Sequence, residues 1–249
     1  MIDLKIYFAG IEGRIKQVER AGGVDYALTS FFYLRGQAVS RVNELKRLVN
    51  KSWLIDSGAF TFMNSGDEVD WDKYIDDYVD FINEYNIELF IELDLYSIIG
   101  IENTEKLRKR LELKTGKKCI PVFHPELGVG YYKRMVEAYN YIAIGGIVVG
   151  KWKDENQMIP LINYAKRKGV KVHGLGFTRT SNLNRFGFYS VDSTSWMADR
   201  FGKLYIFNGR NLQQIKKNTQ KKLDWKKASF YNVTQWKKYA EYMEKKNES

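Results

Sequence analysis

Short apolar segments alternate with longer amphipathic segments along most of the chain, and this alternation constrains the fold more than any other feature. The amphipathic segments, clearest at 71–86, 104–116 and 155–169, have helical spacing of apolar residues. About eight strand–helix units in 249 residues predict a parallel (β/α)₈ TIM-type barrel, with a doubly wound open sheet as the alternative. Nine segments have the length and composition of strands: 4–9, 24–30, 53–56, 89–94, 119–124, 141–145, 170–176, 188–192 and 204–208.

Nine candidates are one more than the barrel needs, so one of them is an edge or additional strand, and 24–30 and 204–208 are the weakest. No Gly-, Ser- or Pro-rich linker divides the chain. We therefore expect a catalytic barrel over residues 1–210 and a basic, aromatic helical extension over 211–249 that packs on the barrel. An apolar stripe within the extension (Val233, Trp236, Tyr239, Ala240 and Met243) has helical spacing.

The positive charge is concentrated at the end of the chain. The net charge is +10, and residues 216–249 carry ten lysines against four acids, a local charge of +6. Lysine pairs interleaved with aromatic residues suit phosphates and stacked bases, which favours a nucleic-acid partner. The alternative is an ordinary solubility charge on the outer face of a helix.

Several classes of protein are disfavoured by composition. Two histidines and a single cysteine, Cys119, leave little material for a Cys/His zinc site and none for an internal disulfide, so we expect no metal, no cofactor and a reducing, cytoplasmic location. The longest apolar run, 141–150, is about half of a membrane span of ~20 residues, so no membrane association is expected.

Polar residues and glycines follow six of the predicted strands. Because the carboxyl ends of barrel strands converge on one mouth, these residues are expected to share a pocket. Any one of the acids, taken alone, is more simply explained as the cap of the next helix. The residues are Asp56, Asp94, His124, Gly145, Gly146, the glycine-rich segment 173–176 and Asp192.

Five motifs, in this order, resemble those of the tRNA-guanine transglycosylase superfamily: DSGAF (56–60), IELDLYS (91–97), GGIVVGK (145–151), HGLGF (173–177) and SVDSTSW (190–196). Members of this superfamily exchange a guanine base for a 7-deazaguanine on a barrel of this kind. The match covers roughly residues 50–200. The zinc-binding subdomain of the family is absent from the sequence, and the short form is similar to the branch that inserts 7-deazaguanines into DNA, in bacteria or phage-infected cells.

The resemblance implies a role for each matched residue. Asp192 occupies the position of the nucleophile, which attacks C1′ of the sugar and forms a covalent intermediate. Asp56 is the candidate acid and base for the leaving and incoming bases. Asp94 would accept hydrogen bonds from the guanine N1–H and amine.

The remaining matched residues would line the base. Gly145 and Gly146 would let backbone amides approach the base carbonyl. Ser57 would donate a hydrogen bond, His124 would stack on or hydrogen-bond the base, and Phe60 would offer a stacking surface, although aromatic residues after strands more often pack in the core or rim.

The sequence departs from the family pattern at four positions: Ala59, Thr61, His124 and Lys151 replace a glycine, two glutamines and a glutamate. The expected partners are DNA, favoured over tRNA, and a free 7-deazaguanine. A helper protein that opens the duplex and a homodimer are compatible with the sequence. A catalytically silent base-binding barrel and a hydrolytic N-glycosylase remain as alternatives.

Overall fold

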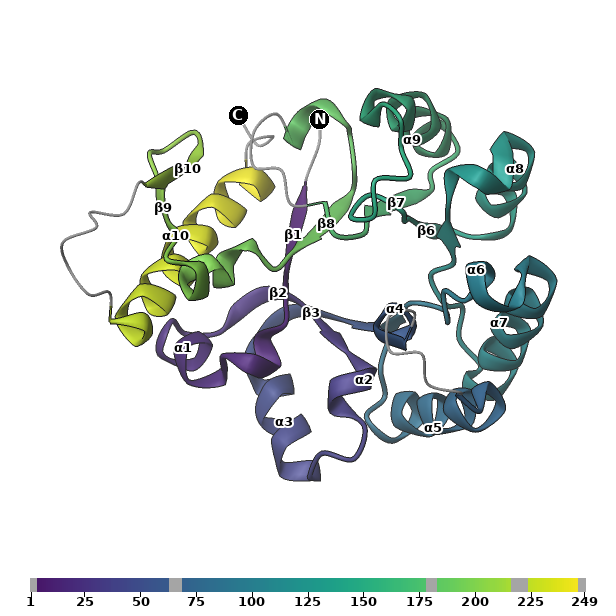
Figure 1. Cartoon of the computed structure of the whole chain (residues 1–249), viewed down its shortest axis with the longest axis horizontal. Coiled ribbons are helices and arrows are strands. Elements are labelled where there is room, and N and C mark those ends of the chain that lie inside the picture. Colours follow the sequence, from purple (N-terminus) through teal and green to yellow (C-terminus); the bar gives the residue numbers. More distant parts are fainter. Residues whose placement is uncertain (1–3, 63–68, 178–182, 216–223, 246–249) are drawn as a thin grey trace.

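The computed structural model describes residues 4–62, 69–177, 183–215 and 224–245 and contains an eight-stranded parallel sheet (Figure 1). The strand order is β4-β3-β2-β1-β8-β7-β6-β5, and a parallel bridge between Ile91 and Ile120 joins the two outer strands. The sheet is thus closed into the predicted TIM-type barrel. Its strands are β1 (Lys5–Ala9), β2 (Val24–Ser30), β3 (Val49–Asp56), β4 (Leu89–Phe90), β5 (Val122–Phe123), β6 (Tyr141–Ile144), β7 (Lys171–Gly174) and β8 (Ser190–Ser193).

Helices surround the barrel in the order expected of strand–helix repeats. The α-helices are α1 (Ile15–Arg20), α2 (Phe31–Leu34), α3 (Val39–Arg47), α4 (Ala59–Phe62), α5 (Trp71–Glu84), α6 (Tyr96–Ile99), α7 (Ile101–Thr115), α8 (Gly128–Ala138), α9 (Met158–Arg167) and α10 (Trp225–Lys245). The 3₁₀ turns are η1 (Ile11–Gly13), η2 (Pro125–Leu127), η3 (Glu155–Gln157), η4 (Leu183–Arg185) and η5 (Ser195–Phe201).

Two apolar layers account for the strand sequences. Alternate residues of each strand point into the barrel, where Tyr7, Tyr26, Leu54 and Tyr141 belong to one buried cluster. The residues between them, such as Phe8, point outward to a larger core beneath the helices. Strands that are covered on both faces read as nearly continuous apolar runs, which is the pattern seen in the sequence.

The helix α5 shows how local sequence sets an element. The Asp70 side chain accepts a hydrogen bond from the Lys73 N–H at 3.0 Å and caps the first turn. The buried residues Tyr74, Ile75, Tyr78 and Ile82 then recur at helical spacing on one face. The Tyr78 hydroxyl donates to the backbone carbonyls of Ile55 and Ile91 on the neighbouring strands, which fixes the helix beside β3 and β4.

The ninth predicted strand, 204–208, lies outside the barrel. It forms β9 (Leu204–Phe207) and pairs antiparallel with β10 (Leu212–Ile215). Strand 24–30, the other weak candidate, is β2 and lies between β1 and β3. Within the described residues, no α-helix follows β7, which is a departure from eight regular repeats.

The last helix, α10, packs against η5, β9 and α1, on the outside of the barrel near β1 (Figure 1). The side chains of Asn232 and Gln235 accept hydrogen bonds from the Tyr205 and Phe207 N–H groups of β9, both at 3.0 Å. Val233, Trp236, Tyr239 and Met243 of the predicted stripe are buried, and the basic helical extension therefore covers the barrel. The domain boundary at residue 210 stays a prediction.

Candidate functional site

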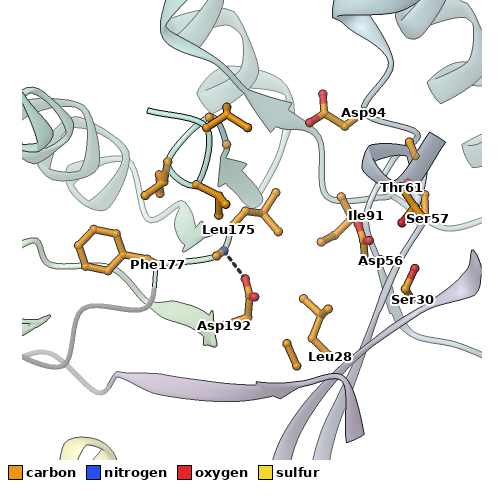
Figure 2. A pocket seen from close by; sticks show the side chains of 18 of the residues that line it. Leu28, Ser30, Asp56, Ser57, Thr61, Ile91, Asp94, Leu175, Phe177 and Asp192 are labelled. Atoms are coloured by element: carbon orange, nitrogen blue, oxygen red, sulfur yellow. Dashed lines mark hydrogen bonds between the residues drawn. The ribbon is translucent and has the colours of Figure 1, made fainter. Parts of the chain in front are cut away.

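A cavity of about 910 Å³ opens at the carboxyl ends of the barrel strands. Asp56 ends β3, Asp94 follows β4 and Asp192 lies in β8, and all three line this cavity together with His124, Gly145 and Gly146. Figure 2 shows Asp192 on one side and Asp56 and Asp94 on the other. Residues separated by up to 136 positions along the chain are thus brought to one cavity by strand order alone.

Asp56 is the acid whose environment most disfavours its charge. Burial raises the pKa of Asp56 to about 7, and the negative charges of Asp192 and Asp94 contribute to the rise. The Gly58 N–H donates to Asp56 Oδ2 at 3.0 Å and opposes it. Such a carboxyl group exchanges a proton near neutral pH, which is the property required of a general acid and base.

Asp192 is held by donors. Its Oδ1 accepts a hydrogen bond from the Gly176 N–H at 2.7 Å, which Figure 2 shows as a dashed line. The same oxygen lies 3.1 Å from His173 Nε2. Gly176 has a φ of +66°, and a Cβ built there would lie 2.3 Å from Val148 Cγ2, so the turn that presents this N–H requires glycine. These two contacts on one oxygen hold the Asp192 carboxyl group in one orientation.

Asp94 and His124 form a pair on the opposite wall. His124 Nε2 lies 3.0 Å and 2.8 Å from the two Asp94 oxygens, and its ring stacks on Tyr96 with centroids 4.4 Å apart. A carboxylate has about four lone-pair sites, so Asp94 retains acceptor capacity toward a ligand. Among the described residues, His124 Nδ1 is buried without a hydrogen-bond partner. The Asp94 carboxylate therefore orients the His124 ring.

The two glycines after β6 have different functions in the structure. The Gly145 N–H donates to the Phe123 carbonyl at 2.8 Å and its own carbonyl accepts from Trp152 Nε1 at 2.9 Å. The expectation that the Gly145 amide approaches a ligand is therefore wrong, because the sheet uses this N–H. A Cβ at Gly145 would lie 2.7 Å from His124 Cε1, so the glycine makes room for that ring.

For Gly146, an approach of the backbone amide to the base carbonyl stays a prediction. This glycine has a φ of +75° and lines the cavity, and its N–H has no hydrogen-bond partner within the described part of the chain. Ser57 also lines the cavity, and its buried Oγ has no partner among the described residues. Phe60 lies in α4, and its side chain is outside what the structure describes. Lys151 lines the cavity, where it contacts the Tyr96 hydroxyl and lies 3.1 Å from Glu126.

Two site residues were not identified from the sequence. Glu12 follows β1 in η1 and lines the cavity; burial raises its pKa to about 7, and the charge of Asp56 contributes. The sequence did carry a signal for Glu12, because this acid lies three residues beyond the end of β1 at Ala9, after a turn at Gly10. His173, which contacts Asp192, was noted only as part of the glycine-rich segment.

Across the described ranges, no helix has both the length and the apolar content needed to cross a membrane. The same residues contain no cluster of three or more His, Cys, Asp or Glu side chains placed to hold a metal ion.

The fold and the cavity define a TIM-barrel protein with an acidic site at the carboxyl ends of its strands. No family model and no curated protein matches the sequence. A solved Coccidioides immitis structure assigned as a fructose-1,6-biphosphate aldolase is similar, with a TM-score of 0.58 and 10% identity, covering 96% of this chain and 89% of that one. The carboxyl transferase domain of Rhizobium etli pyruvate carboxylase gives a TM-score of 0.49 at 13% identity, over 95% and 48% of the two chains. At these identities the likeness concerns the barrel fold alone.

Proposed function

We propose that this protein is a base-exchanging transglycosylase, which replaces a guanine in nucleic acid with a free 7-deazaguanine. The observation that carries the proposal is the meeting of Asp56, Asp94 and Asp192 in one cavity, with environments that differ as their proposed tasks require. The pKa of Asp56 is about 7, so this carboxyl group can both give and take a proton near neutral pH. The Asp192 carboxyl group is instead held by His173 and by the Gly176 N–H. Separating two acids in this way assigns the acid–base role to Asp56 and the nucleophilic role to Asp192.

The reaction proceeds by two displacements at the same carbon. In the first, an Asp192 carboxylate oxygen attacks C1′ and the C1′–N bond breaks, while protonated Asp56 gives its proton to the departing guanine. In the second, Asp56 takes a proton from the incoming base, whose nitrogen attacks C1′ and displaces Asp192. Two inversions retain the anomeric configuration, and the carboxylate stabilises the oxocarbenium character of both transition states.

Recognition of the base falls to the wall opposite Asp192. Asp94 accepts hydrogen bonds from the guanine N1–H and amine, and the Gly146 N–H offers a donor nearby. A base within a duplex cannot reach this cavity, so the target nucleotide is flipped out or single-stranded. DNA is the favoured substrate, and the exposed lysines Lys226, Lys227 and Lys238 of α10 offer phosphate contacts.

Radiolabelled guanine tests the proposal, because exchange of guanine for guanine needs no knowledge of the natural base. The protein is incubated with the label and with single-stranded DNA, duplex DNA or tRNA, and label in the polymer is counted. We expect incorporation into at least one polymer and its loss in Asp192→Asn. Asp80→Asn, at an exposed position on α5, is the matched control and keeps full activity.

The alternatives give different results in the same experiment. Release of guanine without incorporation would identify a hydrolytic N-glycosylase. Binding of nucleic acid without release or incorporation would identify a silent binding barrel, and would refute the proposed function.

A further inference from the structure

A chain of buried polar side chains runs from Asp192 into the barrel. Tyr141 Oη lies 2.6 Å from Ser190 Oγ, Ser190 Oγ lies 2.6 Å from His173 Nδ1, and His173 Nε2 lies 3.1 Å from Asp192 Oδ1. His173 and Ser190 are fully buried, at 0% exposure each. The residues come from the adjacent strands β6, β7 and β8, so the sheet itself sets the spacing of the chain.

The hydrogens of this chain can be placed by counting donors and acceptors. An ionised Asp192 only accepts, so His173 Nε2 carries a hydrogen and donates it. With His173 neutral, Nδ1 accepts from the Ser190 hydroxyl, and Ser190 Oγ accepts from the Tyr141 hydroxyl. Every polar group of the chain is then satisfied. The Ser190–Tyr141 hydrogen bond can run in either direction, so His173 Nδ1 can accept from Ser190 or donate to it, and Nε2 donates to Asp192 in both cases.

The surroundings support this arrangement. Burial raises the pKa of Tyr141 well above its ordinary value, so the phenol keeps the hydrogen that it donates. The titratable groups that face His173 are Asp192 and the two phenols Tyr141 and Tyr7, and the Tyr7 ring meets the imidazole edge to face with centroids 5.7 Å apart. Tyr7 in turn is hydrogen-bonded to Ser52 at 2.9 Å.

We propose that His173 is a positioning residue for the nucleophile: held by Ser190 and Tyr141, its imidazole binds Asp192 Oδ1 and directs Oδ2 toward the sugar carbon. This inference rests on the proposed function. The Gly176 N–H also binds Oδ1, so the two contacts together fix the rotation of the carboxylate. His173 does not line the cavity and touches no substrate; it acts through Asp192.

Activity measurements test the effect on the nucleophile. His173→Leu removes the donor at similar volume, and we expect formation of the covalent intermediate to slow roughly 10- to 100-fold, the value of one hydrogen bond to a charged group. The loss should fall on kcat rather than on KM, because His173 does not line the cavity. His173→Gln, which retains an amide donor, should recover most of the rate.

A second variant and its control guard against loss of folding. Ser190→Ala leaves His173 in place but removes the hydroxyl that holds its Nδ1, and we expect a smaller loss of rate. Ser229→Ala, at a buried serine of α10 far from the cavity lining, is the matched control and should not change the rate. Wild-type rates in both His173→Leu and Ser190→Ala would overturn the inference.

Imidazole ¹⁵N NMR tests the chain without any substrate. The sequence contains only two histidines, so His124→Gln suffices to assign the signals. We expect His173 Nε2 to carry a hydrogen, and the imidazole signals of His173 to shift in Ser190→Ala. A His173 whose Nε2 carries no hydrogen would overturn the inference. Absence of base exchange with every polymer would instead overturn the proposed function while this measurement still stands.

Discussion

Replacement of Asp56 by asparagine should stabilise the protein at neutral and alkaline pH, because burial disfavours the charged form of this carboxyl group in the folded state. Asparagine has nearly the same shape and retains an acceptor for the Gly58 N–H. The pKa of Asp56 is about 7 in the folded protein against a reference of 3.8. A carboxyl whose pKa is raised on folding favours the folded state fully below its unfolded pKa, and this advantage is lost as the pH rises through the folded pKa.

The magnitude follows from the interval between the two pKa values. From 3.8 to about 7 the wild type loses about 4 kcal/mol of unfolding free energy, because each pH unit is worth 1.36 kcal/mol. Contact of Asp56 with cavity water screens part of this cost. The difference between Asp56→Asn and wild type should therefore widen by about 2 to 3 kcal/mol between pH 4.5 and pH 8.

Urea unfolding of the two proteins across this pH range measures the difference. Other groups with raised pKa values, such as Glu12 and Glu92, are present in both proteins and largely cancel. Asp80→Asn reports the effect of removing a charge at the exposed surface of α5. A constant difference between Asp56→Asn and wild type from pH 4.5 to pH 8 would refute the reasoning, and with it the acid–base role of Asp56.

Three further predictions address other parts of the structure. Arg108→Met removes the buried partner of Glu92, and unfolding in urea should show a loss of about 3 to 5 kcal/mol; a loss under about 1 kcal/mol would contradict the pairing. Gly145→Ala puts a methyl group against the His124 ring, and a fluorescence titration should show guanine bound at least about tenfold more weakly, unless the ring does not serve the base. Replacing Lys226, Lys227 and Lys238 of α10 by glutamate should lower affinity for single-stranded DNA and flatten its log–log salt slope by about 2, whereas an unchanged slope would place the DNA elsewhere.

The barrel could be predicted because each of its strands is covered on both faces. The bounds of the strands were harder to predict. Residues 89–94 and 119–124 have the composition of six-residue strands, but β4 and β5 extend over two residues each. The segment 204–208 has the apolar content of a barrel strand. Two of the four residues of its partner β10 are polar and three are exposed, so nothing in the sequence indicated that the two would pair outside the barrel.

The acids of the cavity could be predicted because strand ends converge whatever the details of packing. Hydrogen bonding could not, since it depends on register. The pairing of Gly145 with Phe123 follows from the β5–β6 ladder and removes the amide expected to meet a ligand. The contact of His173 with Asp192 likewise follows from the β7–β8 register. The polar residues Asn232 and Gln235, buried on α10, interrupt the predicted apolar stripe because they bind the edge of β9.

The central claim is that Asp192 forms a covalent bond to a nucleic-acid sugar in a cavity shared with Asp56 and Asp94. Denaturing quench of the protein with a guanine-containing oligonucleotide, followed by mass spectrometry of the peptides, tests it directly. We predict an adduct carrying the oligonucleotide without one guanine, located on Asp192 and absent from Asp192→Asn. Base exchange that proceeds undiminished in Asp192→Asn, or an adduct on another residue, would contradict the account.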